Sequence, residues 1–169
     1  MTDKLFYKSV TDSEFEAEVK SCLKTEKGYQ IILDRTLFYP EGGGQPADNG
    51  IICNAEIYDV QDSNGEVVHY SDKPLEVGAK VKGSVDMDRR HRLMQQHSGE
   101  HIVSGLIHNK FGYDNVGFHM GSDCITIDFN GTLTERDLDG IEKEANEIIY
   151  RDFEPHIFYP SSEELARLA

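Results

Sequence analysis

The spacing of apolar residues changes near residue 88, and this change limits the possible folds more than any other feature of the chain. Before it, short runs of alternating or β-branched residues are separated by turn signals such as Asn64-Gly65, a pattern typical of strands joined by tight hairpins. After it, apolar residues recur at helical spacing to about Lys110, with Asp88 as the expected N-cap. The sequence therefore predicts an α+β protein: a small glycine-rich β-barrel domain over residues 1–88, then a domain over residues 89–169 with helices packed on an antiparallel sheet.

The same patterns predict the individual elements. Strands are expected over residues 15–23, 29–33, 51–52, 55–60, 67–70 and 78–86. Beyond the first long helix we expect a strand pair at 116–120 and 124–129, a helix capped by Thr134, a strand at 153–159 and a short helix from Ser162. That last helix has no C-terminal cap and no strand after it, which is typical of a chain that stops inside a domain.

Charge and cysteine content limit the function and the compartment. The chain has 169 residues, 31 of them acidic and 17 basic, for a net charge of −14. Such a chain repels phosphate at long range, so contact with nucleic acid must come from a partner segment or from a local basic patch such as Arg89, Arg90 and Arg92. The three cysteines are widely spaced without a C-x-x-C pair, and no segment approaches the about 20 apolar residues of a membrane span. We therefore expect a cytoplasmic protein that does not enter a membrane.

His97 and His101 form the first candidate site. Residues four apart lie on one face of a helix, where two imidazoles can bind the same metal ion, and zinc is the metal that such a pair suits best. The segment from His97 to His101 also fits the H-x-x-E-H pattern of inverted zinc peptidases, in which Glu100 would be the general base. Spacing alone leaves a zinc site, a peptidase and a chance pair all open.

The second candidate site is a glycine triplet, Gly42 to Gly44, followed by Gln45. Glycines allow a backbone to approach a ligand closely, and the amide of Gln45 offers both a donor and an acceptor beside it. The triplet lacks the G-K-[ST] ending of a phosphate-binding loop, which excludes nucleoside triphosphate binding of that type. A flexible hairpin tip is the alternative, but the flanking prolines and two preceding aromatic residues favour a binding loop.

Together these two segments bring a family resemblance. The run Phe38-Tyr39-Pro40-Glu41-Gly42-Gly43-Gly44-Gln45-Pro46, followed by Arg92-x4-His97-x3-His101, resembles the editing domain of alanyl-tRNA synthetase and the freestanding AlaX-type proteins. The resemblance covers roughly residues 30 to 160. It implies hydrolysis of the ester that joins serine or glycine to alanine tRNA. Such mischarging arises because binding pockets discriminate poorly among small side chains.

The resemblance also implies roles for individual residues. His97 and His101 would bind zinc and act with Gln45 in catalysis, while the acceptor end of the tRNA would be held by Thr36, Gly42, Gly43, Gly44, Gln45 and Arg92. The family completes its metal site with a Cys-x-x-x-His segment beyond a helix like the one over residues 161–169, so we expect this chain to end before it. Cys124, His108 and His119 are weaker candidate ligands, and His69 and His156 are expected to be structural. Three functions stay open: an editing hydrolase, a zinc peptidase and a non-catalytic tRNA-binding module.

Overall fold

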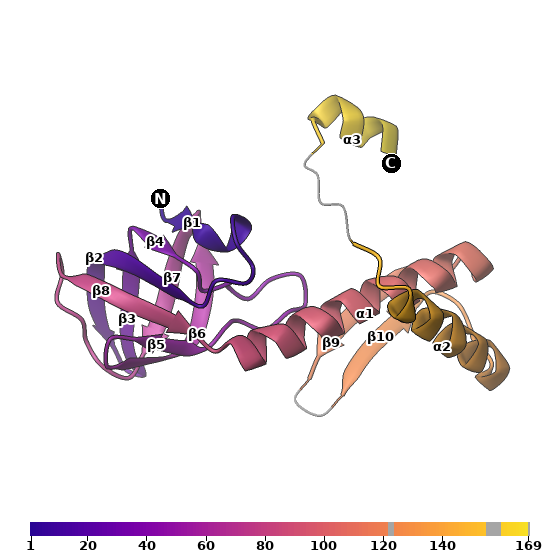
Figure 1. The fold of residues 1–169 in the computed structure, drawn as a ribbon, viewed down its shortest axis with the longest axis horizontal. Coiled ribbons are helices and arrows are strands. Elements are labelled where there is room, and N and C mark those ends of the chain that lie inside the picture. The colour runs from indigo at the N-terminus through magenta and orange to yellow at the C-terminus, as the bar shows by residue number, and fades with distance from the viewer. Residues whose placement is uncertain (122–123, 155–159, 169) are drawn as a thin grey trace.

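The computed structural model describes residues 1–121, 124–154 and 160–168. Its first half is a closed barrel of six antiparallel strands (Figure 1), in the order β2-β3-β7-β6-β5-β8. The barrel strands are β2 (Glu14–Thr25), β3 (Gly28–Leu33), β5 (Gly50–Ile52), β6 (Ala55–Ser63), β7 (Glu66–Ser71) and β8 (Lys80–Val85). Before it, β1 (Asp3–Lys4) pairs in parallel with β4 (Arg35–Thr36) and is followed by a 3-10 turn, η1 (Leu5–Tyr7).

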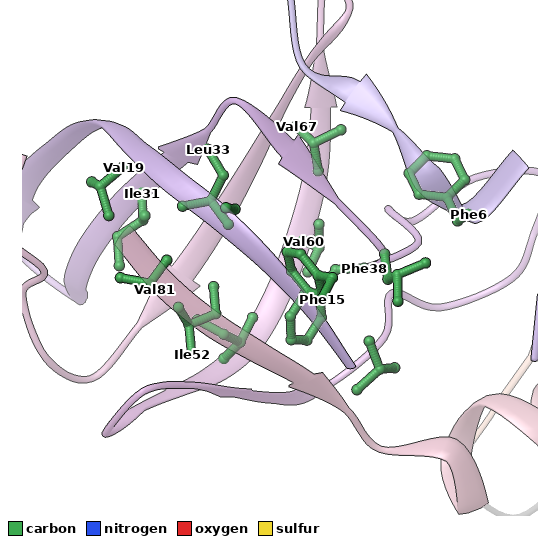
Figure 2. Packing of buried hydrophobic residues seen from close by; sticks show 14 of the residues in the cluster. Phe6, Phe15, Val19, Ile31, Leu33, Phe38, Ile52, Val60, Val67 and Val81 are labelled. Atoms are coloured by element: carbon green, nitrogen blue, oxygen red, sulfur yellow. The ribbon is translucent and has the colours of Figure 1, made fainter. Parts of the chain in front are cut away.

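Apolar residues that alternate along the strands fill the barrel (Figure 2). In β8, for example, buried and exposed residues alternate, as the two-residue period of a strand requires. Val81 and Val85 are two of the buried residues. Phe15 and Phe38 pack edge to face at 5.9 Å between ring centroids, in the same interior. A Cβ atom at Gly83 would lie 2.4 Å from the Phe15 ring, so only glycine fits that strand position.

Helix α1 (Met87–Phe111) follows β8 directly. Its N-cap is Asp86, whose carboxylate accepts a hydrogen bond of 2.9 Å from the backbone N–H of Arg89. The expectation that Asp88 caps this helix was wrong, because the chain leaves β8 in an extended conformation at Asp86 and turns into the helix at the next residue. The helix ends at Gly112, which takes the left-handed conformation with φ of 71°.

The second half of the chain contains the expected strand pair and helices. Strands β9 (Asn115–Met120) and β10 (Ile125–Phe129) are antiparallel, and α2 (Glu135–Tyr150) packs against α1. The predicted cap of α2 is confirmed, since Thr134 and Asp137 form a reciprocal capping box. A short helix, α3 (Ser162–Leu168), completes the described elements. The α+β fold class is therefore confirmed.

One predicted strand and the predicted domain boundary stay predictions. The strand predicted over residues 153–159 falls mainly on 155–159, outside the described residues, and Phe153 and Glu154 are not in a strand. The division into domains at residue 88 stays a prediction, since α1 spans that position without a break. None of the helices in the described part of the chain combines the length and the hydropathy needed to cross a membrane.

One buried ion pair joins α1 to the barrel. Arg90 binds the carboxylate of Asp48 and the carbonyl oxygen of Leu37. The side chains of Arg90 and Asp48 are almost inaccessible to solvent. Asp48 also accepts a hydrogen bond of 2.7 Å from the backbone N–H of Tyr39. Because removing one partner of such a pair would leave a buried charge, this contact fixes the start of α1 against the loop that carries the glycine triplet.

Candidate functional site

The glycine triplet forms a tight hairpin turn. Gly42 and Gln45 exchange two backbone hydrogen bonds of 3.1 and 3.0 Å, which leaves Gly43 and Gly44 as the two turn residues. Both have left-handed φ values, 60° and 81°, the combination that a type I′ turn requires and that glycine adopts most readily. The turn places the side chain of Gln45 in a buried position against α1.

Gln45 binds the first of the two candidate ligands. Its amide oxygen Oε1 lies 2.9 Å from Nδ1 of His97. Since an amide oxygen only accepts, Nδ1 of His97 carries the proton and Nε2 keeps the lone pair that a metal ion needs. A Cβ atom at Gly43 would stand 3.8 Å from Cε1 of His97, so the bare turn lies directly beside this imidazole.

His101 lies beside the carboxylate of Glu100. Its Nδ1 lies 3.2 Å from Oε2 of Glu100, and the rings of His97 and His101 stack with centroids 4.9 Å apart. The ligand atoms of His97, Glu100 and His101 all lie within 4.8 Å of one another. With Nδ1 of His97 bound to Gln45 and Nδ1 of His101 close to Glu100, the two Nε2 atoms are the ones left to hold a metal ion, an arrangement typical of metal-binding histidines.

Glu100 is itself tied into the fold. Its side chain is 6% exposed, and Oε1 accepts hydrogen bonds from Oγ of Ser104 at 2.5 Å and from Nδ2 of Asn115 at 2.7 Å. Sequence reasoning missed both donors. Ser104 lies four residues after Glu100 on the helix, a spacing that could have indicated it, whereas the contact with Asn115 on β9 has no local signal.

The surroundings of His97 keep it neutral. Burial lowers the pKa of its imidazole, the neighbouring His101 lowers it further, and Glu100 acts in the opposite direction. Phe118 of β9 stacks on the ring at 5.5 Å between centroids. A neutral imidazole at pH 7 is the form that binds a metal ion.

Other residues expected at the site lie elsewhere. Thr36 is fully buried in the barrel, where its Oγ1 lies 2.8 Å from Nε2 of His69 and accepts a 3.0 Å hydrogen bond from the backbone N–H of Phe38. It does not join the hydrogen-bonded group of Gln45 and His97. Arg92 is exposed and lines a separate hollow of about 400 Å³ beside Pro46.

The remaining candidates do not add a ligand to this group. Arg90 is committed to Asp48, which corrects the suggestion that it contacts phosphate from an open basic patch. His108 pairs with Asp114 at 3.0 Å, and Cys124 and His119 are exposed. Within the described residues, His97, Glu100 and His101 form the one cluster of three or more potential metal ligands.

Comparison with known proteins gives consistent matches. A family described as tRNA synthetases class II (A) matches residues 2–89. The AlaX-M alanyl-tRNA editing protein of Saccharolobus solfataricus is 38% identical over 97% of this chain and 71% of its own length, and that of Methanosarcina mazei is 35% identical over 97% and 70%. The alanine–tRNA ligase of Halorubrum lacusprofundi is 38% identical over 89% of this chain, which spans only 17% of that relative. The chain therefore belongs to the family that includes the AlaX-type alanyl-tRNA editing proteins and the matching segment of alanyl-tRNA synthetases.

Proposed function

We propose that this protein is an aminoacyl-tRNA editing hydrolase that removes serine or glycine wrongly attached to alanine tRNA. The observation that carries the proposal is the pair of imidazoles on α1 beside a turn without side chains, with Nδ1 of His97 bound to Gln45 and Nδ1 of His101 close to the carboxylate of Glu100. The names of the relatives support the same reaction, since several are alanyl-tRNA editing proteins.

The donor set fits zinc. Two imidazoles from one helical face supply two of the four ligands that zinc usually takes, with Gln45 bound to the first and Glu100 beside the second. A bound zinc ion would supply positive charge to polarise the ester carbonyl or to position a water molecule. The chain's own contribution is to orient both imidazoles and to lower the pKa of His97 by burial.

Gln45 has a second capacity at this position. Its oxygen is used by His97, so its amide NH₂ group remains as a donor for the ester carbonyl of the substrate. A donor fixed in advance at this point would stabilise the negative charge that develops on that oxygen during hydrolysis. Gly43 leaves room for the ribose and the aminoacyl group to come close to Gln45, since the nearest atom to the position of its Cβ is Cε1 of His97 at 3.8 Å.

Glu100 makes the peptidase alternative less favourable. The general base of an inverted zinc peptidase must have a carboxylate oxygen that reaches a water molecule on the metal. Here Oε1 is bound by Ser104 and Asn115, and Oε2 faces His101. This environment favours a carboxylate that orients a ligand over one that moves protons.

The deciding experiment measures the release of serine from alanine tRNA that has been mischarged with serine. Alanine tRNA correctly charged with alanine is the comparison substrate. We expect the wild-type protein to hydrolyse the seryl ester faster, and His97→Ala or Gln45→Ala to reduce turnover at least about 100-fold, as loss of a group that stabilises the transition state does. His91→Ala is the matched control, because His91 is an exposed histidine on the same helix outside the cluster. Binding of tRNA without turnover by the wild-type protein would instead support a non-catalytic module.

A further inference from the structure

The loop that carries the glycine triplet is closed at its base by Asp48. The backbone N–H of Asp48 donates a 3.0 Å hydrogen bond to the carbonyl oxygen of Tyr39, and the carboxylate of Asp48 accepts one of 2.7 Å from the backbone N–H of Tyr39. Residues 39–48 therefore form a closed loop whose tip is the turn of the glycine triplet, with Gln45 directly after it. Because glycine backbones are permissive, the direction of the tip depends on how the base is held.

The first turn of α1 holds this base on two sides. Arg90 binds the carboxylate of Asp48 and, on the side where the chain enters the loop, the carbonyl oxygen of Leu37. On the side where the chain leaves it, Arg89 donates from Nε and Nη2 to the carbonyl oxygen of Ala47 at 3.3 and 3.2 Å. Two neighbouring arginines of the helix thus fasten both sides of the base.

The helix sets the spacing between this base and the candidate metal ligand. Arg90 and His97 are seven residues apart, which is two turns and about 10 Å along one face of a helix. On the loop, Asp48 follows Gln45 by three residues, a stretch that spans at most about 11 Å. Since Asp48 binds Arg90 and Gln45 binds His97, the two segments lie alongside each other with little length to spare. A slip of the helix by one residue would rotate His97 away from Gln45 by about 100°.

Stability alone is a weak reason for a buried ion pair at this position. The side chains of Arg90 and Asp48 are 4% and 0% exposed, and the attraction between two such charges offsets the loss of their hydration only when the geometry is excellent. An apolar pair of similar volume is often as stable or more stable. An apolar pair lacks direction, however, whereas the planar guanidinium binds Asp48 and Leu37 in one fixed arrangement. The geometry that the ion pair imposes therefore explains it better than the stability that it adds.

We propose that Asp48 and Arg90 are positioning residues of the candidate site, which act through Gln45 by holding it against His97. The inference rests on the proposed function, in which the hydrogen bond from Nδ1 of His97 to Gln45 leaves Nε2 for a metal ion. Without the ion pair, the loop keeps its glycine turn but loses this hydrogen bond. The proton of His97 then exchanges between the two ring nitrogens, and the form that offers Nε2 to a metal ion is less populated.

The test compares the wild-type protein with the double variant Asp48→Leu/Arg90→Met, in which apolar side chains of similar size replace the ion pair. NMR of protein labelled with ¹⁵N-histidine, recorded without metal at pH 8, shows which ring nitrogen carries the proton. Competition with a chromogenic chelator measures the affinity for Zn²⁺. We expect the proton of His97 on Nδ1 in the wild-type protein and partly on Nε2 in the double variant, with zinc affinity about tenfold lower. Neither measurement requires deacylation, so the proposed function can fail or succeed independently.

His69 provides an internal control for the fold. Its Nδ1 lies 3.0 Å from the carbonyl oxygen of Ile31, which only accepts, and its Nε2 lies 2.8 Å from the hydroxyl oxygen of Thr36. The proton of His69 is therefore on Nδ1 as long as the barrel is intact. In the double variant this signal and the urea midpoint should match those of the wild-type protein. A loss of structure would change His69 as well as His97, whereas a loss of positioning changes His97 alone.

Two further variants show whether the ion pair acts through Gln45. Gln45→Ala alone should lower zinc affinity by about the same factor, and adding it to the double variant should cause no further loss, because residues that act through one contact are not additive. Glu144→Gln is the matched control, since it removes an exposed ion pair with Lys110 at the other end of α1 and should change neither measurement.

The result that would overturn the proposal is a double variant with the wild-type signals of both histidines and wild-type zinc affinity. A further loss on adding Gln45→Ala, or a wild-type protein in which the proton of His97 is already shared between both nitrogens, would also contradict it. If the double variant loses the His69 signal, Arg90→Lys decides by the same criteria, because it keeps the charge of the buried pair and removes only the planar fork. If the chain binds no zinc, the NMR result alone decides.

Discussion

Glu100 occupies the position at which an inverted zinc peptidase carries its general base, but among the described residues its carboxylate contacts Ser104, Asn115 and His101. Ser104 and Asn115 fix one oxygen, and the other faces His101. A carboxylate that orients a metal ligand raises the affinity for the metal, and losing it typically costs about 10- to 100-fold. The role of this residue is therefore measurable separately from turnover.

We predict that Glu100→Ala lowers zinc affinity about 10- to 100-fold, whereas Glu100→Gln, which keeps an accepting oxygen, lowers it less and keeps most of the deacylase activity. Competition with a chromogenic chelator measures the affinity, and Glu147→Gln serves as the control because Glu147 is exposed on α2. If Glu100→Gln abolished turnover while zinc affinity stayed at the wild-type level, Glu100 would be a general base and the orienting role would be wrong.

The hairpin turn is the element that brings Gln45 to the helix, and Gly44 is its most constrained residue. Its φ of 81° is left-handed, and a Cβ atom there would lie 2.5 Å from the ring of Phe118. We predict that Gly44→Ala lowers the free energy of unfolding by about 1–2 kcal/mol, the cost of placing an L-residue in that conformation, and reduces deacylation by displacing Gln45. Urea unfolding measures the first effect.

Gly105→Ala is the matched substitution. Gly105 lies within α1, and nothing stands within 4 Å of the position of its Cβ atom. Since alanine favours a helix more than glycine does, this variant should be more stable than the wild-type protein by up to about 1 kcal/mol. Equal stability of the two alanine variants would show that the turn is not constrained as described.

At this scale, local patterns predicted most elements. Barrel strands and the two long helices follow from their apolar period, and Thr134 marks the start of α2 because its cap is formed with a residue three positions later. The patterns failed where the signal is short or distant. Asp86 and Asp88 are equally good caps by type, and only the end of β8 decides between them. The two residues of β1 carry no detectable period.

For the molecule as a whole, the site depends on contacts between segments far apart in the sequence. Arg90 and Asp48 are separated by 42 residues, and Gln45 and His97 by 52, so no periodicity relates them. The resemblance paired the glycine triplet with the histidines, but it did not indicate that Gln45 contacts His97 directly. It also assigned Thr36 to substrate binding; the hydroxyl of Thr36 lies inside the barrel beside His69, and its role in substrate binding stays a prediction.

His69 links the stability of the whole barrel to pH. It is fully buried, Nδ1 lies 3.0 Å from the carbonyl oxygen of Ile31, and burial lowers the pKa of its imidazole from 6.5 to about 4. Between these values the unfolded chain binds a proton that the folded protein does not, so the stabilisation present above pH 6.5 is lost as pH falls towards 4. The difference corresponds to about 3 kcal/mol of unfolding free energy.

We predict that the contribution of His69 to the free energy of unfolding, measured with urea, falls as the pH is lowered from 6.5 to about 4 and is constant below that range. His69→Gln removes the titrating group and should flatten this part of the profile. Carboxylates such as Asp137, whose pKa is lowered by its hydrogen bond to Thr134, lose their contribution only below about pH 4 and act in a separate window. An NMR titration in which the folded His69 takes up its proton near 6.5, or an unchanged slope in His69→Gln, would contradict the linkage between this buried imidazole and the stability of the barrel.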